Sequence, residues 1–183
     1  MENASVAPTC VQSPAVSPSD LDRQILLLAR TRAHGRRAER VTTAYSRLGE
    51  HAACWLALGA AGVVLDPDRR QAWGKGLAIV ASAYALNFAV KVAVRRPRPE
   101  LPDLPALTGT VSRLSFPSAH ATTSFAAARA FGSLAPAAAL YSAAGAFAIS
   151  RPYLGVHYPS DVLAGALLGT AIARFWPQRG SRP

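Results

Sequence analysis

The fold is decided by residues 72–99, which read AWGKGLAIVASAYALNFAVKVAVRRPRP. From Ala72 to Val94 this stretch is almost entirely apolar or small. A helix rises about 1.5 Å per residue, so a helix of this length spans roughly 30 Å, the thickness of the hydrocarbon core of a bilayer. Pro97 and Pro99 then end the helix, and arginines surround them. The stretch therefore predicts a membrane-spanning helix that ends in a cationic cluster.

Further apolar segments continue this pattern along the chain. Helices of a soluble domain show a polar face, and these segments have almost none. We expect an all-α integral membrane helical bundle, with about five transmembrane helices in residues 50–177. Besides 72–94, the expected helices cover about 50–65, 118–135, 136–150 and 160–176. For the short third and fourth helices, a soluble all-α core is the alternative. The spacing of Gly165 and Gly169 allows helices to approach closely in lipid.

The N-terminal residues differ from this bundle. Residues 1–20 are rich in Ser, Pro, Ala and Val, lack the features of a signal peptide, and are expected to form a disordered tail. Residues 178–183 form a second tail. Within 21–49, apolar residues recur at helical spacing, first at Leu21, Ile25, Leu28 and Ala29 and then at Val41, Ala44, Tyr45 and Leu48. We predict two amphipathic helices on the membrane surface, with a cytosolic helical hairpin as the alternative.

The charge distribution excludes some classes of partner. The net charge is +10 although only 16% of the residues are charged, and the arginines gather before the first apolar segment and at segment ends. This placement favours anionic lipids and phosphate, and we expect no nucleic-acid partner. Cys10 and Cys54 lack the spacing of a zinc site or a disulfide framework, so the cysteines imply neither. We expect no cofactor. The oligomeric state stays open.

Lys91 and Arg98 form the first of three polar clusters at helix ends. They lie seven positions apart, and the prolines turn the chain before Arg98. A lysine within a membrane helix is costly, so it suggests a functional role. The alternative is a lysine that extends to the membrane interface among other basic residues.

Ser118, Ala119 and His120 form the second cluster, at the start of an apolar segment. The free N–H groups at a helix N-terminus bind anions, and Ser118 adds a hydroxyl. Alternatively, Ser118 is only an N-cap. His120 is a candidate acid or a polar residue with a structural partner.

Arg151, His157 and Asp161 form the third cluster. His157 and Asp161 lie four positions apart, the spacing of one helix face. Asp161 could accept a hydrogen bond from one ring nitrogen and raise the basicity of the other, as in catalytic triads. Alternatively, Asp161 favours a helix N-terminus, and His157 lies in an interfacial loop.

Together, the three clusters resemble the signature of the type 2 phosphatidic acid phosphatase (PAP2) superfamily over roughly residues 72–176. The matching pattern is Lys91-x6-Arg98-Pro99, Pro117-Ser118-x-His120 and Ser150-Arg151-x5-His157-x3-Asp161. Ala119 departs from it, because the family usually has Gly there. Within the superfamily, residues 104–129 look similar to actinobacterial decaprenylphosphoryl-5-phosphoribose phosphatases, which remove the sugar 5-phosphate during synthesis of the cell-wall arabinose donor.

The resemblance implies a role for each matching residue. His157 would be the nucleophile that forms a phosphohistidine, and Asp161 would orient it. His120 would protonate the leaving group and then activate water. The implied phosphate-binding residues are Lys91, Arg98, Ser118, Ala119 and Arg151. No metal is expected.

We therefore expect an enzyme that removes a phosphate from a lipid-linked substrate, with polyprenyl-phosphoryl-phosphoribose favoured. A phosphatase for polyprenyl diphosphate, phosphatidic acid or phosphatidylglycerol phosphate is the alternative, and the loop at 100–116 would distinguish these head groups. Vanadium haloperoxidases share the anion site but are soluble. A catalytically silent membrane scaffold is the alternative outside enzymes.

The N-terminal arginines also predict the orientation in the membrane. Residues 22–47 contain seven arginines against two acids. Positive residues favour the cytoplasmic side. With five spans in the cell membrane, all three clusters would then meet at the cytoplasmic face.

Overall fold

The computed structural model describes residues 18–32 and 34–177. Every secondary-structure element assigned in these ranges is a helix, which confirms the all-α class. With the 3₁₀ turns η1 and η2, the elements are α1 (Pro18–Thr31), α2 (Arg36–Leu48), η1 (Glu50–Ala52), α3 (Ala53–Leu65), η2 (Pro67–Arg69), α4 (Arg70–Val94), α5 (Ala119–Phe131), α6 (Ala137–Tyr153) and α7 (Pro159–Arg174). The predicted tails fall mostly outside the described residues, but α1 already includes residues 18–20.

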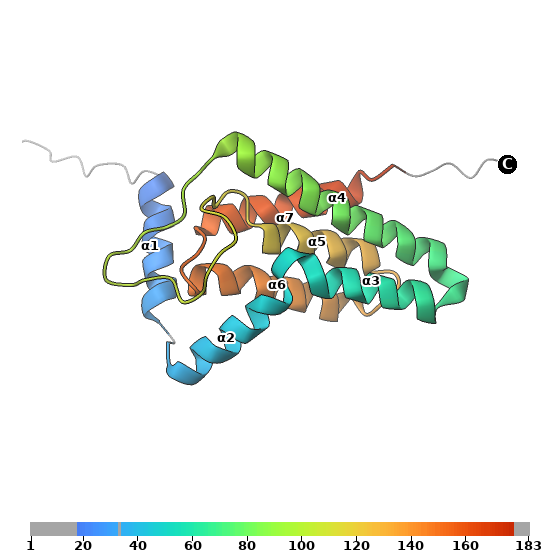
Figure 1. The fold of residues 1–183 in the computed structure, drawn as a ribbon, viewed down its shortest axis with the longest axis horizontal. Helices are drawn as coiled ribbons and strands as arrows, with labels where there is room; N and C mark the ends of the chain where they lie inside the picture. The colour runs from blue at the N-terminus through green and yellow to red at the C-terminus, as the bar shows by residue number, and fades with distance from the viewer. Residues whose placement is uncertain (1–17, 33, 178–183) are drawn as a thin grey trace, which may run out of the picture.

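Helix α5 is the centre of the bundle, and α4, α6 and α7 pack around it (Figure 1). The contact with α7 is especially close. A Cβ atom added at Gly165 would lie 2.6 Å from the carbonyl oxygen of Ser118, and one at Gly169 would lie 2.0 Å from that of Thr122. No side chain fits at these separations, so the predicted close helix approach is observed between α5 and α7.

Aromatic residues join the remaining helices to this centre. Trp73 of α4 packs on Phe131 of α5, with ring centroids 5.3 Å apart. Trp55 of α3 lies 5.9 Å from Phe147 of α6 by the same measure, and its indole N–H donates to Ser124 of α5 at 2.8 Å. A buried indole needs such a partner. These contacts hold the walls of the bundle at fixed positions around α5.

The expected count of five membrane spans is not confirmed. Among the described residues, one helical stretch, Pro67–Val94, is long and apolar enough to cross a membrane. A second candidate exists only if α2 and the stretch Glu50–Leu65, which meet at a bend of 48°, count as one span. Helices α3, α5, α6 and α7 have 13, 13, 17 and 16 residues. At about 1.5 Å per residue, each is shorter than a hydrocarbon core of roughly 30 Å.

Several helix boundaries near the three polar clusters differ from the sequence-based expectation. Helix α6 continues to Tyr153, so Arg151 lies in its last turn instead of after it. Helix α7 begins at Pro159, because proline suits the first helical turn, and Tyr158 is the N-cap in place of Ser160. Residues 50–52 form the separate turn η1 instead of the start of a long helix.

Both predicted N-terminal helices exist, and α1 packs on the bundle by one side. The residues of α1 that are buried against the bundle are Asp22, Leu26 and Arg30. The apolar residues Leu21, Ile25 and Leu28 are instead exposed. Helix α1 is therefore attached to the bundle mainly through polar contacts, and its apolar face is left free.

Candidate active site

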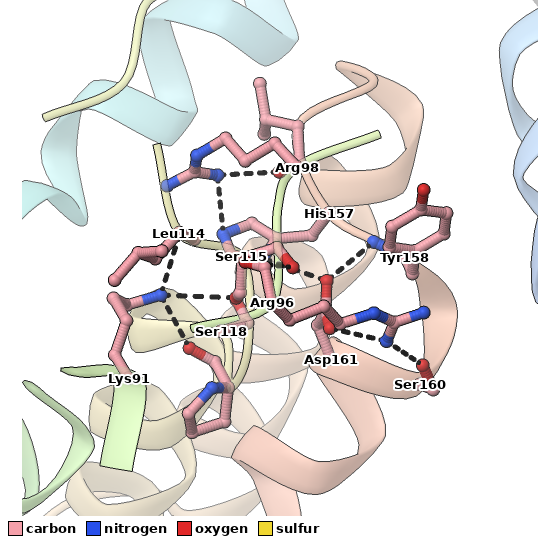
Figure 2. A network of polar contacts seen from close by, with 12 residues as sticks. Lys91, Arg96, Arg98, Leu114, Ser115, Ser118, His157, Tyr158, Ser160 and Asp161 are labelled. Atoms are coloured by element: carbon pink, nitrogen blue, oxygen red, sulfur yellow. Dashed lines mark hydrogen bonds and ion pairs between the residues drawn. The ribbon is translucent and has the colours of Figure 1, made fainter. Parts of the chain in front are cut away.

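A cavity of about 120 Å³ brings the three clusters together at one end of the bundle. It lies where the end of α4, the start of α5 and the end of α6 meet. The predicted residues that line it are Lys91, Arg98, Ala119, His120, Arg151 and His157. Ser118 and Asp161 are fully buried, and Figure 2 shows them beside Lys91, Arg98 and His157.

Lys91 points into the bundle, as predicted, and is 6% exposed. Its ammonium donates to the carbonyl oxygens of Leu114, Ser115 and Pro117 at 3.1, 3.2 and 3.0 Å (Figure 2). An ammonium has three donors, so the loop before α5 uses all of them. Lys91 thus holds this loop against α4, and its positive charge remains at the wall of the cavity.

Arg98 determines which nitrogen of His157 carries the proton. Its Nη1 lies 3.1 Å from Nε2 of His157 (Figure 2). A guanidinium only donates, so Nε2 must accept and the ring proton must be on Nδ1. Nδ1 lies 3.5 Å from Oδ2 of Asp161, longer than an ordinary hydrogen bond. The imidazole therefore has its lone pair on Nε2 and its proton on the side of the carboxylate.

The environment of His157 keeps its ring neutral. The side chain is 2% exposed, so it is buried and not at the surface as the loop position suggested. Burial, followed by the positive charges of Arg98, Arg151 and Lys91, lowers the pKa of His157 well below its ordinary value. Burial also lowers the pKa of Arg98, to about 10, which leaves it charged at neutral pH. A neutral imidazole among fixed cations is a competent nucleophile toward an anion.

The carboxylate of Asp161 is held by hydrogen bonds. Its Oδ2 accepts from the backbone N–H of Tyr158 at 2.9 Å, and its Oδ1 accepts from Nη1 of Arg96 at 2.8 Å. Arg96 also donates to Asp22 of α1 at 2.7 Å. Partial burial opposes the charged form of Arg96, but hydrogen bonding and attraction by Asp22 and Asp161 raise its pKa above the ordinary value. Asp161 thus lies beside a permanent cation.

Ser46 at the end of α2 contacts two of the predicted residues. Its carbonyl oxygen lies 2.9 Å from Nε2 of His120, and its hydroxyl accepts from Nη1 of Arg151. A carbonyl only accepts, so Nε2 of His120 carries a proton and Nδ1 is the nitrogen available for proton transfer. The second histidine and the third cation therefore both contact Ser46.

Some buried polar atoms at this site have no partner among the described residues. These atoms are Oγ of Ser118, Nε of Arg151 and Nδ1 of His157. Helix α5 begins beside them at Ala119, where first-turn N–H groups lack intrahelical acceptors. Buried polar atoms without partners are rare and need an explanation. A bound oxyanion would accept hydrogen bonds from Ser118 and Arg151, whereas Nδ1 of His157 faces Asp161.

Arg96, Asp22 and Ser46 are the residues at this site that sequence reasoning missed. Arg96 belongs to the run of arginines between Lys91 and Pro99, but spacing alone did not indicate which arginine contacts which group. Asp22 and Ser46 have no local signal, because their partners lie far away in the sequence. Within the described residues, no group of three or more His, Cys, Asp or Glu is positioned to hold a metal ion.

Comparison with known proteins agrees with the fold. A decaprenylphosphoryl-5-phosphoribose phosphatase from Mycolicibacterium smegmatis is 46% identical over 125 residues, 67% of this chain and 68% of that protein. The crystal structure of LpxE from Aquifex aeolicus has a TM-score of 0.72 at 22% identity, over 84% of this chain and 93% of the other. That of a transmembrane PAP2-type phosphatidylglycerolphosphate phosphatase from Bacillus subtilis has a TM-score of 0.67 at 24% identity, over 85% and 82%. At these low sequence identities, both structures show that the fold is similar and nothing about the activity of this chain.

The three clusters all fall within one family match. Residues 72–182 match the PAP2 superfamily, and this range contains every predicted site residue. It excludes α1 and α2, which supply Asp22 and Ser46. The chain belongs to the PAP2 superfamily.

Proposed function

We propose that this protein is a membrane phosphatase that hydrolyses a lipid-linked phosphomonoester, with decaprenylphosphoryl-5-phosphoribose as the favoured substrate. The observation that carries the proposal is the environment of His157. Its unprotonated Nε2 faces Arg98, its ring is neutral, and Lys91 and Arg151 add positive charge. The name of the mycobacterial relative supports the choice of substrate.

The first chemical step follows from the protonation of the two histidines. The Nε2 lone pair of His157 attacks phosphorus, an N–P bond forms, and the bond from phosphorus to the alcohol oxygen breaks. The phosphate monoanion of the substrate passes its proton to Nδ1 of His120 on binding, and His120 then gives this proton to the departing alcohol oxygen. Asp161 stabilises the positive charge that develops on the ring of His157. The product of this step is a phosphohistidine.

The second step releases phosphate. His120, now neutral, takes a proton from water, and the water oxygen attacks phosphorus as the N–P bond breaks. Charge on the phosphoryl oxygens is held in both steps by preorganised donors. These are the side chains of Arg98, Ser118 and Arg151 and the first amides of α5, including that of Ala119, while Lys91 contributes its positive charge to phosphate binding.

Exposed apolar side chains support a membrane location. Phe88 of α4, Ile149 of α6 and Leu163 of α7 are 58%, 70% and 63% exposed. Large apolar surfaces of this kind mark contact with lipid or with another protein. We propose that they face the acyl chains of the cell membrane, that the exposed apolar face of α1 lies at its surface, and that the N-terminal arginines place the site at the cytoplasmic face.

Release of phosphate by the purified protein tests this function. The substrates would be decaprenylphosphoryl-5-phosphoribose, a polyprenyl diphosphate, phosphatidic acid and phosphatidylglycerol phosphate, with the variant His157→Ala as the control. We expect the first to be hydrolysed most efficiently. A preference for another lipid phosphate would identify that lipid as the substrate. Release of phosphate from none of them would favour a catalytically silent scaffold.

A further inference from the structure

The chain segment between α2 and α3 forms one side of the cavity. Gly49, Glu50, His51 and Ala52 all line it, together with the predicted site residues. This segment lies outside the range that matches the superfamily, residues 72–182. It therefore adds groups to the site that the three clusters do not include.

The segment is held against the site in a strained conformation. His51 and Ala52 have φ angles of 53° and 60°, in the left-handed region that residues with a Cβ rarely adopt. A Cβ atom at Gly49 would lie 2.8 Å from Cδ2 of His120 and 2.8 Å from Cε1 of Phe147. Strain of this kind collects at ligand-binding sites, where the surrounding packing maintains it.

The polar groups of this segment are unsuited to bind a phosphate. Glu50 lines the cavity and interacts electrostatically with Arg151. Its carboxylate would repel a second phosphate group, but it accepts hydrogen bonds from hydroxyls. Nδ1 of His51 lies 2.8 Å from the hydroxyl of Tyr84, which also lines the cavity. This pair can both donate and accept.

The two functional surfaces of the cavity are thus chemically different. The inner wall holds the cations around His157, and the segment at 49–52 supplies a carboxylate, an imidazole and, through Tyr84, a phenol. The exposed side chains of Phe88 and Val111 add apolar groups to the lining. A substrate that fits all of these groups carries a phosphate, neighbouring hydroxyls and an apolar chain.

We propose that Glu50, His51 and Tyr84 form a subsite for the hydroxyl groups of a sugar whose phosphate is bound by Lys91, Arg98 and Arg151. The subsite rests on the proposed phosphatase function and specifies its substrate class, a sugar phosphate instead of a glycerolipid phosphate. The role of these three residues is recognition, so their effect is selective for substrates that contain the hydroxyls.

Two synthetic substrates that differ only in those hydroxyls test the subsite. They are octyl riboside 5-phosphate and octyl 2,3-dideoxyriboside 5-phosphate, each assayed in detergent micelles with the full-length protein. We expect kcat/KM to favour the first by roughly tenfold or more, since a site built to bind hydroxyls leaves its polar groups unpaired with the second. Glu50→Gln and Tyr84→Phe should each remove most of that preference while the dideoxy substrate is affected about twofold or less.

The control variant is Glu39→Gln, which changes a carboxylate of α2 that contacts His34 and should retain the full preference. An equal change in kcat/KM for both substrates in Glu50→Gln would overturn the subsite, because it would mean that Glu50 acts only through its electrostatic interaction with Arg151. Absence of any preference in the wild type would also overturn it.

Binding separates this inference from the proposed chemistry. In the His157→Ala background, the riboside should raise the melting temperature more than its dideoxy analogue, and adding Glu50→Gln should abolish the difference. If the wild type released no phosphate but this difference persisted, the proposed function would fail and the subsite would stand. Equal stabilisation by both compounds would overturn the subsite even if phosphate were released.

Discussion

Arg96 donates a 2.8 Å hydrogen bond to Asp161, the carboxylate that lies 3.5 Å from His157. The same guanidinium donates to Asp22, so the N-terminal helix α1 is linked to the proposed nucleophile through one arginine. Asp22 also accepts from the backbone N–H of Ser160, at the start of α7. Helix α1 therefore helps to fix the position of the carboxylate, although it lies outside the family match.

Arg96→Gln should lower kcat by about tenfold, equivalent to about 1.4 kcal/mol in the activation barrier, because Asp161 loses a donor that orients it. KM should change little, since Arg96 does not line the cavity that binds the phosphate. Steady-state kinetics would measure both constants. Arg95→Gln is the matched control, because Arg95 is exposed and its side chain donates to the carbonyl of Val92. An equal loss in the control, or a change in KM alone, would contradict the positioning role.

His157→Ala should abolish turnover, and Asp161→Asn should reduce kcat by about a thousandfold or more, by analogy with the orienting carboxylate of a catalytic triad. Rapid acid-free quenching with radiolabelled substrate should trap a phosphohistidine in the wild type and none in His157→Ala. Both variants should melt in detergent at nearly the wild-type temperature, which would show that they fold. Turnover near the wild-type rate in His157→Ala would exclude the mechanism.

The buried neutral state of His157 predicts how stability depends on pH. Its pKa is lowered in the folded protein, so between the unfolded value of about 6.5 and the lower folded value, the unfolded chain binds a proton that the folded protein does not. Stability should therefore be fully present above about pH 6.5 and fall below it, by at most about 1.4 kcal/mol per pH unit from this group.

Denaturant unfolding of the wild type and His157→Asn from pH 7.5 to pH 5 would measure this contribution. The two proteins share all other titrating groups, so the free energy of unfolding should change less steeply with pH in the variant. Identical slopes would mean that His157 is protonated in the folded protein as readily as in the unfolded chain.

Phosphate release should continue in the presence of EDTA, because Lys91, Arg98 and Arg151 supply the positive charge that a divalent ion would otherwise provide. Vanadate should inhibit, because it binds as a phosphoryl analogue between the same cations. Activity assays with EDTA and with a vanadate titration would measure both effects. Loss of activity in EDTA that magnesium restores would refute this account.

The proposed orientation in the membrane is open to chemical labelling. In cells with Cys10 and Cys54 replaced, a membrane-impermeant thiol reagent applied from outside should label a cysteine at Asp68 but miss one at Thr108, which lies in the loop between α4 and α5. Thr108 should react after the cells are made permeable. Labelling at Thr108 in intact cells would place the site on the outer face.

Much of the site was predictable from short-range spacing. Ser118 to His120 span the start of one helix, so local geometry alone places them together. His157 and Asp161 also lie close together, but the expected spacing on one helix face is wrong as the reason, because His157 precedes α7, which begins at Pro159. Lys91 was expected to point inward because a charged residue within an apolar helix needs a buried partner, and it is found bound to three carbonyl groups. The resemblance of the joined pattern to one superfamily is confirmed by the family match.

The tertiary structure alone decided which distant residues complete the site. Ser46 meets His120 and Arg151, and Asp22 meets Arg96, across 74 to 105 positions of sequence. Such contacts depend on the packing of whole helices, to which many residues contribute, so no local pattern predicts them. The same holds for the face that α1 turns to the bundle and for the short lengths of α3, α5, α6 and α7. The sequence by itself determined the helical class, the superfamily and the set of chemical groups, because each of these follows from residue types and their spacing over short stretches. The positions of the chemical groups relative to one another arise only when the helices pack around α5.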